Sequence, residues 1–303
     1  METQVRSLIY STRQITHQLL PQTDTATTLL DRASFLPCLV NWCAEKVVGT
    51  YVISFPKCGV TWLRLMIAKV LELHFNLTDS SLDLIGQLDV GIACLHSKIP
   101  RIRVKHDDEP HKKCSEQLNP CKNSYRYAKV IFLVRDPRDV IVSLYFFAKN
   151  RPYFRRISDV DLSSFLRSPI GSFDTLLTYY NIWADNRTIP RDFLLVRYED
   201  MQISAEQELR RVLTFLGLEI KDEIIQEAVD FTQFSNMRKL EEKAEFSSVM
   251  KGFNQSDKNS FHVRKGKIGG FREELGQEDI IYLRRRMTEL LSDSAIELYQ
   301  YFD

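Results

Sequence analysis

The amino-acid sequence predicts an α/β fold with a central, mostly parallel sheet flanked by helices. Short, nearly continuous apolar runs, typical of strands buried on both faces, alternate with longer segments of helical pattern. This alternation is typical of parallel sheets, because each parallel crossover needs a connection about as long as a helix. The 303 residues fit one large α/β domain or two smaller ones, and a hydrophobic content of 44% excludes a largely disordered chain.

Four apolar runs are the strand candidates, at residues 51–55, 101–104, 130–134 and 193–196. The first leads through a short loop into an apolar-rich helix at 62–75. The third leads into Asp136-Pro137, a pair that starts helices because Asp caps the first turn and Pro fits its first position. The sequence therefore predicts two strand–loop–helix units in the first half of the chain.

Two further helices are predicted downstream. Residues 204–207 (Ser-Ala-Glu-Gln) have the pattern of a capping box, and Gly217 is a suitable end for the helix that follows. A helix at 278–291 closes the chain. The polar, basic stretch at 251–270 is interpreted as a long loop, and loops of that length in a compact domain are often functional.

Charge and cysteine content bound the partners and the compartment. Lys and Arg number 41 and Asp and Glu number 40, so a net charge of +1 gives no general reason to expect a nucleic-acid or membrane-surface partner. No run of about 18 apolar residues predicts a membrane span, and residues 1–22 lack the apolar core of a secretory signal. The six cysteines form no C-x-x-C pair, and a chain of this length does not depend on disulfides. We expect a reduced, cytoplasmic protein.

The first candidate site is the loop after the first strand, residues 56–61 (Pro-Lys-Cys-Gly-Val-Thr). A helix that opens at the end of a parallel strand presents unpaired N–H groups and the positive end of its dipole, which together attract anions. Lys57 adds a full charge, Thr61 adds a hydroxyl, and Gly59 lets the backbone approach a ligand closely. An ordinary turn with a surface lysine is the alternative. The loop is not a Walker A motif, because the pattern G-x-x-x-x-G-K-[ST] is absent.

Two more basic features follow. Arg135 ends a predicted buried strand, and Ser143 lies eight residues further on, so a guanidinium and a hydroxyl could hold one phosphate. A structural Arg–Asp network with a helix serine is the alternative. Residues 264–272 contain four cations and three glycines, which favour a backbone that wraps around an anion over a merely solvated loop.

Together these segments make the chain resemble the cytosolic-type sulfotransferases, which use 3′-phosphoadenosine 5′-phosphosulfate (PAPS). The family's loop P-K-[ST]-G-[TS]-[TS]-W is matched by residues 56–62, its Arg and Ser eight residues apart by Arg135 and Ser143, and its R-K-G-x-x-G-x-[WF]-[KR] by residues 264–272. Tyr198 opens a Y-E-D segment, and residues 232–237 match T-x-F-x-x-M. The five motifs occur in family order over residues 51–272.

The resemblance implies a single P-loop-like domain over residues 48–303, with residues 1–47 as an N-terminal lead packed on it. It also implies PAPS as co-substrate and the 3′,5′-bisphosphate PAP as product. The residues that the resemblance assigns to binding of the nucleotide are Lys57, Cys58, Gly59, Val60, Thr61, Trp62, Arg135, Ser143, Tyr198, Thr232, Phe234, Met237, Arg264, Lys265 and Gly266.

The resemblance also suggests a catalytic base. Residues 100–106 resemble the family segment in which a strand ends on the catalytic histidine, here His106. An imidazole titrates near pH 6.5, which suits proton transfer at neutral pH. A structural histidine is the alternative, and Asp107 or Asp108 could instead orient the ring or act as the base.

Several positions depart from the family pattern. Cys58 and Val60 replace hydroxyl residues, so backbone N–H groups and Lys57 must contribute more of the binding. Val104 stands where many members have a lysine near the sulfuryl group, and the side chain of the adjacent Lys105 would point to the opposite face of the strand. The family's short C-terminal dimer motif is not found, so the oligomeric state stays open.

The sequence therefore predicts a sulfotransferase that moves a sulfuryl group from PAPS to a hydroxyl or amine of a small-molecule acceptor. Lys57 would stabilise the leaving phosphate and His106 would deprotonate the acceptor. No metal is expected, because a sulfuryl group bears less charge than a phosphoryl group. A P-loop-like nucleotide kinase or NTPase and an inactive PAP-binding protein are the alternatives. Aromatic stretches at 145–147, 153–154 and 179–180 are candidate pocket walls that favour an apolar or aromatic alcohol.

Overall fold

The computed structural model describes residues 49–77, 99–149, 159–242, 259 and 261–300. The predicted N-terminal lead at 1–47 lies outside these residues, as do the aromatic pair at 153–154 and most of the first half of the predicted loop at 251–270.

A four-stranded, all-parallel sheet forms the centre of the molecule. Its strands are β1 (Thr50–Ser54), β2 (Ile102–Lys105), β3 (Lys129–Val134) and β4 (Asp192–Arg197), in the order β2-β1-β3-β4. The register pairs Ser54 with Leu133 and Val134 with Arg197, so the carboxyl ends of neighbouring strands lie level with one another. All four predicted strands are confirmed to within one residue at either end.

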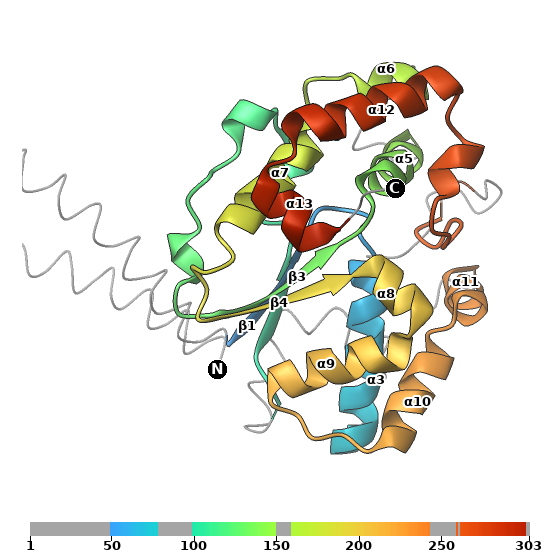
Figure 1. Cartoon of the computed structure of the whole chain (residues 1–303). Coiled ribbons are helices and arrows are strands. Elements are labelled where there is room, and N and C mark those ends of the chain that lie inside the picture. Colours follow the sequence, from blue (N-terminus) through green and yellow to red (C-terminus); the bar gives the residue numbers. More distant parts are fainter. Residues whose placement is uncertain (1–48, 78–98, 150–158, 243–258, 260, 301–303) are drawn as a thin grey trace, which may run out of the picture.

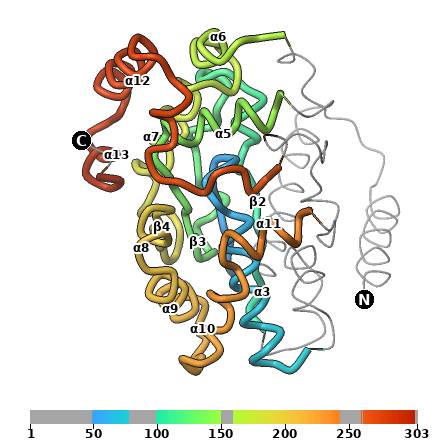
Figure 2. The backbone as a smooth tube through the Cα atoms, turned by 90° about the vertical axis from the view of Figure 1, so that its right-hand side faces the viewer, coloured from blue at the N-terminus to red at the C-terminus, as the bar shows by residue number. Residues whose placement is uncertain are grey.

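Helices cover both faces of the sheet (Figure 1). The helices on one face are α3 (Val60–Phe75), α9 (Ala205–Leu216) and α10 (Asp222–Phe231). Those on the other are α5 (Pro137–Lys149), α6 (Leu162–Leu166), α7 (Phe173–Asp185), α12 (Gln277–Leu290) and α13 (Asp293–Tyr299). Helices α8 (Tyr198–Ile203) and α11 (Phe234–Glu242) follow β4 and α10. The perpendicular view shows the same two layers, with α5, α6 and α12 away from α3, α9 and α10 (Figure 2).

Short 3-10 helices connect some of these elements. Three lie between β2 and β3, at Pro110–Lys112, Ser115–Gln117 and Asn123–Tyr125. A fourth, Gly270–Glu273, precedes α12.

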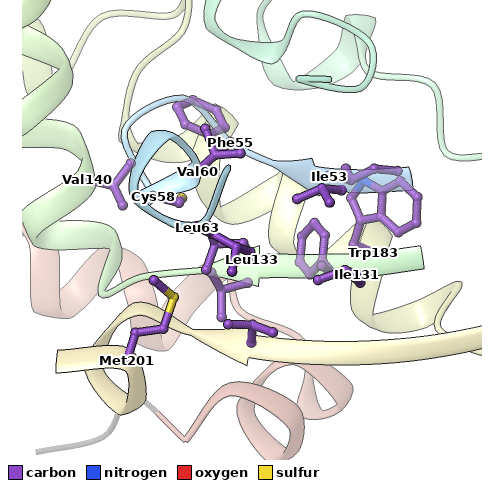
Figure 3. Close-up of a cluster of buried hydrophobic side chains, with 14 of the residues drawn as sticks. Ile53, Phe55, Cys58, Val60, Leu63, Ile131, Leu133, Val140, Trp183 and Met201 are labelled. Carbon is purple, nitrogen blue, oxygen red and sulfur yellow. The ribbon is translucent and has the colours of Figure 1, made fainter. Parts of the chain in front are cut away.

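The core lies between the sheet and its helices. Ile53, Ile131 and Leu133 of the central strands pack with Leu63 of α3 and Trp183 of α7 (Figure 3). The ring of Phe132 is stacked on that of Trp183, with centroids 5.3 Å apart. Because such interiors are close-packed, the strand ends are held rigidly where the polar residues begin.

The structure corrects three expectations. Tyr179 and Tyr180 are not pocket walls, since both lie in the core at 1% and 0% exposure. Ser204 precedes α9 as expected, but its side chain makes no capping hydrogen bond, so the capping box does not form. The helix predicted at 278–291 does not close the chain, because α13 follows it. By contrast, the carboxylate of Asp136 accepts the N–H of Arg138 at 2.9 Å and caps α5 as predicted.

Cys58, Cys114 and Cys121 have free thiols, while the other three cysteines lie outside the described part of the chain. No helix in the described part combines the length and apolar character needed to cross a bilayer.

Candidate active site

The candidate site lies where the four parallel strands end. Lys57 follows β1, His106 follows β2, Arg135 follows β3 and Tyr198 follows β4. In open α/β sheets the crevice outside the carboxyl ends of the strands is where ligands bind. All four residues line one cavity of about 880 Å³ at this edge.

Almost every residue that the sequence assigned to the site lines this cavity. Apart from Cys58, all of the predicted catalytic and nucleotide-binding residues line it, from Lys57 to Gly266. The five motifs, which span more than two hundred residues of sequence, therefore converge in space. What each side chain does with a ligand stays a prediction.

The loop before α3 is shaped by Gly59. This residue is the N-cap of α3 and has φ 99°, a left-handed conformation that favours glycine. A Cβ at this position would lie 2.6 Å from Cδ2 of Tyr198, so a larger residue would collide with that ring. The first turn of α3 thus approaches Tyr198 closely and presents the N–H groups of its first residues at the cavity.

Lys57 lies in the same loop, two residues before Gly59. Its ammonium lies 4.5 Å from the ring centroid of Phe147 and 3.5 Å from the carbonyl oxygen of His262. Both contacts are weak, a cation–π interaction and a long hydrogen bond.

The side chain of Cys58 turns away from the cavity, so this residue offers a ligand only its backbone, as expected where a hydroxyl residue is replaced. The thiol is fully buried among core residues (Figure 3) and lies 3.4 Å from the hydroxyl of Tyr180. Burial raises the pKa of the thiol to about 12, so it stays neutral. The hydroxyl of Tyr180 also donates to the carbonyl of Arg135 at 2.8 Å, which ties the loop to the end of β3.

Arg135 links three segments of the site. Its guanidinium donates to the carbonyl of Lys267 at 2.9 Å and to that of Lys57 at 3.5 Å. The same group lies 4.2 Å from the ring centroid of Tyr198. One side chain therefore contacts the loop before α3, the start of α8 and the basic segment, defined here as residues 261–272.

Asp139, which the sequence indicated only as a member of a structural Arg–Asp network, binds the backbone of the basic segment. Its buried carboxylate accepts the N–H groups of Gly269 at 2.8 Å and Phe271 at 2.9 Å, and lies 3.7 Å from Arg135. Burial raises its pKa, an effect that the charge of Arg135 opposes. The spacing of four residues between Arg135, just before α5, and Asp139, in its first turn, was the signal available in the sequence.

Three of the four Lys and Arg side chains in the basic segment are paired with nearby carboxylates. Arg264 and Lys265 each lie 2.6 Å from Glu274. Lys265 and Lys267 lie 2.9 Å and 3.0 Å from Glu273. These ion pairs could not be foreseen from the motif, which ends at Arg272.

Aromatic side chains also line the cavity, next to the basic residues. The rings of Trp62 and Tyr198 meet edge to face, with centroids 5.8 Å apart. Phe234 lies against Gly266, where a Cβ would come within 2.5 Å of the ring. The hydroxyl of Thr232 donates to the carbonyl of Ala228 at the end of α10, so this hydroxyl proton is used in a hydrogen bond within the protein.

His106 has one ring nitrogen fixed by the backbone. Its Nδ1 lies 2.9 Å from the carbonyl oxygen of Ser54, a contact that requires the proton on Nδ1. The lone pair of the neutral ring then resides on Nε2. Burial lowers the pKa of His106, the hydrogen bond to Ser54 opposes this, and the nearby charges of Arg64 and Lys57 lower it further.

The two aspartates that follow His106 are both engaged with other partners. Asp107 is bound to Lys122 at 2.8 Å and accepts the hydroxyl of Tyr125. Asp108 is paired with Lys113 and accepts the N–H of Asn119 at 2.7 Å. Neither lines the cavity, and the carbonyl of Ser54 rather than a carboxylate orients the imidazole.

Glu241 of α11 is a second carboxylate that the sequence did not reveal. It is 2% exposed and accepts the N–H groups of His262 at 2.7 Å and Val263 at 3.0 Å. It thereby fixes the carbonyl of His262 near Lys57. Glu241 stands in a polar stretch with no pattern that distinguishes it from a solvated residue.

Two further observations describe the site. Among the predicted aromatic walls, Phe147 lines the cavity, whereas Tyr145 is buried in the core and Phe146 packs under Arg264. Within the described residues, no group of three or more His, Cys, Asp or Glu side chains is arranged to hold a metal ion.

Comparison with known proteins decides the family. Residues 49–295 match the model of the sulfotransferase domain. The chain belongs to the sulfotransferase family. Cytosolic sulfotransferase 12 of Arabidopsis thaliana is 25% identical over 268 residues, covering 81% of this chain and 78% of that protein. The amine sulfotransferase of Oryctolagus cuniculus is 23% identical, covering 82% of each chain.

The fold agrees with this family. The crystal structure of mouse sulfotransferase SULT7A1 complexed with PAP superposes with a TM-score of 0.58, at 20% identity, over 84% of this chain and 90% of that one. The predicted P-loop-like fold class and the prediction of a PAPS-dependent sulfotransferase are thus confirmed at the level of the family. Membership decides against the nucleotide kinase alternative.

The geometry at Gly59 yields a first prediction. Replacing it in Gly59→Ala forces a strained φ and a collision with Tyr198, so we expect PAP affinity to fall by about tenfold or more, with a stability loss of about 1–3 kcal/mol. Calorimetric titration and urea unfolding measure the two effects.

Gly217→Ala is the matched control. Gly217 also has a positive φ, 79°, but a Cβ there would meet nothing within 4 Å. We expect a stability loss of about 1 kcal/mol and unchanged PAP affinity. Equal losses of affinity in both variants would show that the approach of Gly59 to Tyr198 has no special part in binding.

Proposed function

We propose that the protein transfers a sulfuryl group from PAPS to a hydroxyl or amine of a small-molecule acceptor, with His106 as general base and Lys57 stabilising the leaving phosphate. One observation carries the proposal. Lys57, Arg135 and Arg264, from three remote segments, line the same cavity as a histidine whose surroundings keep it neutral.

The residues present fit an anionic nucleotide. Arg135 Nε and Trp62 Nε1 are buried donors with no hydrogen-bond partner among the described residues, and both side chains line the cavity. Buried donors of this kind are costly unless a ligand or water satisfies them. A 3′-phosphate carries roughly two negative charges and three acceptor oxygens, which match such donors.

Each basic element has its own part in binding. Arg135, Ser143, Arg264 and Lys265 would hold the 3′-phosphate, and the edge-to-face rings of Trp62 and Tyr198, with Phe234, would enclose the adenosine. Lys57 and the amides at the start of α3 would hold the 5′ end. Since Cys58 and Val60 offer no side-chain hydroxyl there, Lys57 and the backbone N–H groups would provide a larger share of the binding at the 5′ end.

The reaction requires the protein to accept one proton, that of the acceptor hydroxyl. The bound donor supplies an electrophilic sulfur and a phosphate leaving group. His106 would accept the proton of the acceptor hydroxyl at Nε2, while Nδ1 stays hydrogen-bonded to Ser54 and holds the ring in place. Lys57 would stabilise the negative charge that develops on the 5′-phosphate, where a fixed cation contributes most.

The acceptor and the compartment are proposals as well. Phe147 beside Lys57 supports an apolar or aromatic acceptor, and the relative named an amine sulfotransferase supports including amines. The relatives named cytosolic sulfotransferases support a cytoplasmic location.

Two measurements test the function. Thermal-shift assays with PAP and with ATP compare the nucleotides, and we expect stabilisation by PAP at concentrations where ATP has little effect. Transfer from radiolabelled PAPS to a panel of phenols, aliphatic alcohols and amines then tests activity. Stabilisation by ATP alone would contradict the proposal, and strong PAP binding without turnover of any acceptor would favour the inactive, PAP-binding alternative.

Removing the charge of Lys57 tests the leaving-group role. In Lys57→Met we expect kcat to fall by about 10²- to 10³-fold, because stabilisation of the developing charge is lost, with a smaller effect on PAP affinity. Lys239→Met, an exposed lysine of α11 outside the cavity, is the control. A kcat for Lys57→Met near that of the control would remove Lys57 from this role.

The environment of His106 sets a pH dependence. The protonated ring cannot accept a proton, so the rate falls as pH falls through the pKa, which lies below the usual 6.5. We expect kcat/KM to lose activity only at pH values below 6.5, and His106→Ala to lower kcat by about 10²-fold or more with PAP affinity intact. His74→Ala, at the end of α3 and outside the cavity, is the control. A midpoint above 6.5, or retained rate in His106→Ala, would point to another base.

A further inference from the structure

The basic segment is followed directly by two glutamates that hold its cations. Glu274 lies 2.6 Å from both Arg264 and Lys265. Glu273 lies 2.9 Å from Lys265 and 3.0 Å from Lys267. The three cations line the cavity, whereas neither glutamate does.

These contacts reduce what the segment offers to a ligand. Three of its four cations share two carboxylates, so these five groups carry a net charge of 3 − 2 = +1, and Arg272 takes no part in these ion pairs. Lys265, with three N–H donors, directs two of them at carboxylates. The side chains of Arg264 and Glu274 are only 11% and 18% exposed, so this ion pair is screened less than one at the surface.

We propose that Glu274 determines how strongly the site distinguishes a nucleotide with a 3′-phosphate from one without it, by competing with that phosphate for Arg264 and Lys265. The inference rests on the proposed function, which assigns these two cations to the 3′-phosphate. In addition, Glu274 would pair with Arg264 and Lys265 while no nucleotide is bound, and would pair with them again when PAP dissociates.

The competition follows from the charges of the two rivals. A phosphate brings roughly two charges and three acceptor oxygens, against one charge on a carboxylate, so it can displace Glu274. The cost of breaking the existing ion pairs is then subtracted from the affinity for PAP. Adenosine 5′-monophosphate has no 3′-phosphate, so it leaves Glu274 in place and its affinity carries no such cost.

The test compares two nucleotides on one substitution. Calorimetric titrations of the full chain with PAP and with adenosine 5′-monophosphate are run on wild type, on Glu274→Gln and on Glu278→Gln. Glu278 is exposed in the first turn of α12 and removes the same charge from the same stretch of chain. We expect Glu274→Gln to tighten PAP by about threefold to tenfold, with the monophosphate and both Glu278→Gln titrations unchanged within about twofold.

The expected result is a gain in PAP affinity, and this distinguishes it from damage to the fold, because a misfolded variant would bind PAP more weakly. In the background Arg264→Ala/Lys265→Ala, the gain from Glu274→Gln should disappear, since the contested cations are gone. Unchanged or weaker PAP binding in Glu274→Gln would overturn the inference and make Glu274 a residue that orients Arg264 from behind. If wild type binds PAP no better than the monophosphate, the assignment of the 3′-phosphate in the proposed function fails first.

Discussion

The guanidinium of Arg135 is the contact on which the arrangement of the site depends. It sits at the end of a buried central strand, so the sheet fixes its position, and it donates to carbonyls of Lys57 and Lys267. Those two carbonyls belong to segments that the sequence separates by 210 residues, since 267 − 57 = 210. Because Asp139 in the first turn of α5 binds the backbone N–H groups of Gly269 and Phe271, the basic segment is attached to α5 at two points. The end of β3 therefore holds the loop before α3 and the basic segment side by side at the cavity.

The neutral state of His106 follows from the same architecture. Burial beside Lys57 and Arg64 disfavours a further positive charge, and the carbonyl of Ser54 selects the tautomer with its lone pair on Nε2. Ser54 ends β1 and His106 follows β2, two adjacent parallel strands, so the pairing that builds the sheet also orients the imidazole. A fold that places an imidazole among cations thus favours the neutral ring at neutral pH, which is the state that a general base requires.

Much of the fold and most of the site could be predicted because the information is local. Strands buried on both faces appear as continuous apolar runs, and the residues just after them mark the edge where ligands bind. Other features depend on what lies across the molecule. The sequence does not show that Cys58 turns toward Tyr180, that α7 buries Tyr179 and Tyr180 in the core, or that Glu241 reaches the backbone at His262. Buried carboxylates that bind remote N–H groups look like surface acids in a sequence, so they were missed.

The same carboxylates explain how a chain with a net charge of +1 can be built around a cavity for a polyanion. Unpaired cations gathered in one cavity would repel one another and weaken the folded state. Here Arg135 has Asp139 at 3.7 Å, and Arg264 has Glu274 at 2.6 Å, so these cations are partly neutralised before any ligand arrives. A nucleotide phosphate that binds such cations exchanges one anionic partner for another. Its affinity then reflects the difference between two sets of ion pairs, so the carboxylates that pair with these cations enter the binding free energy together with them.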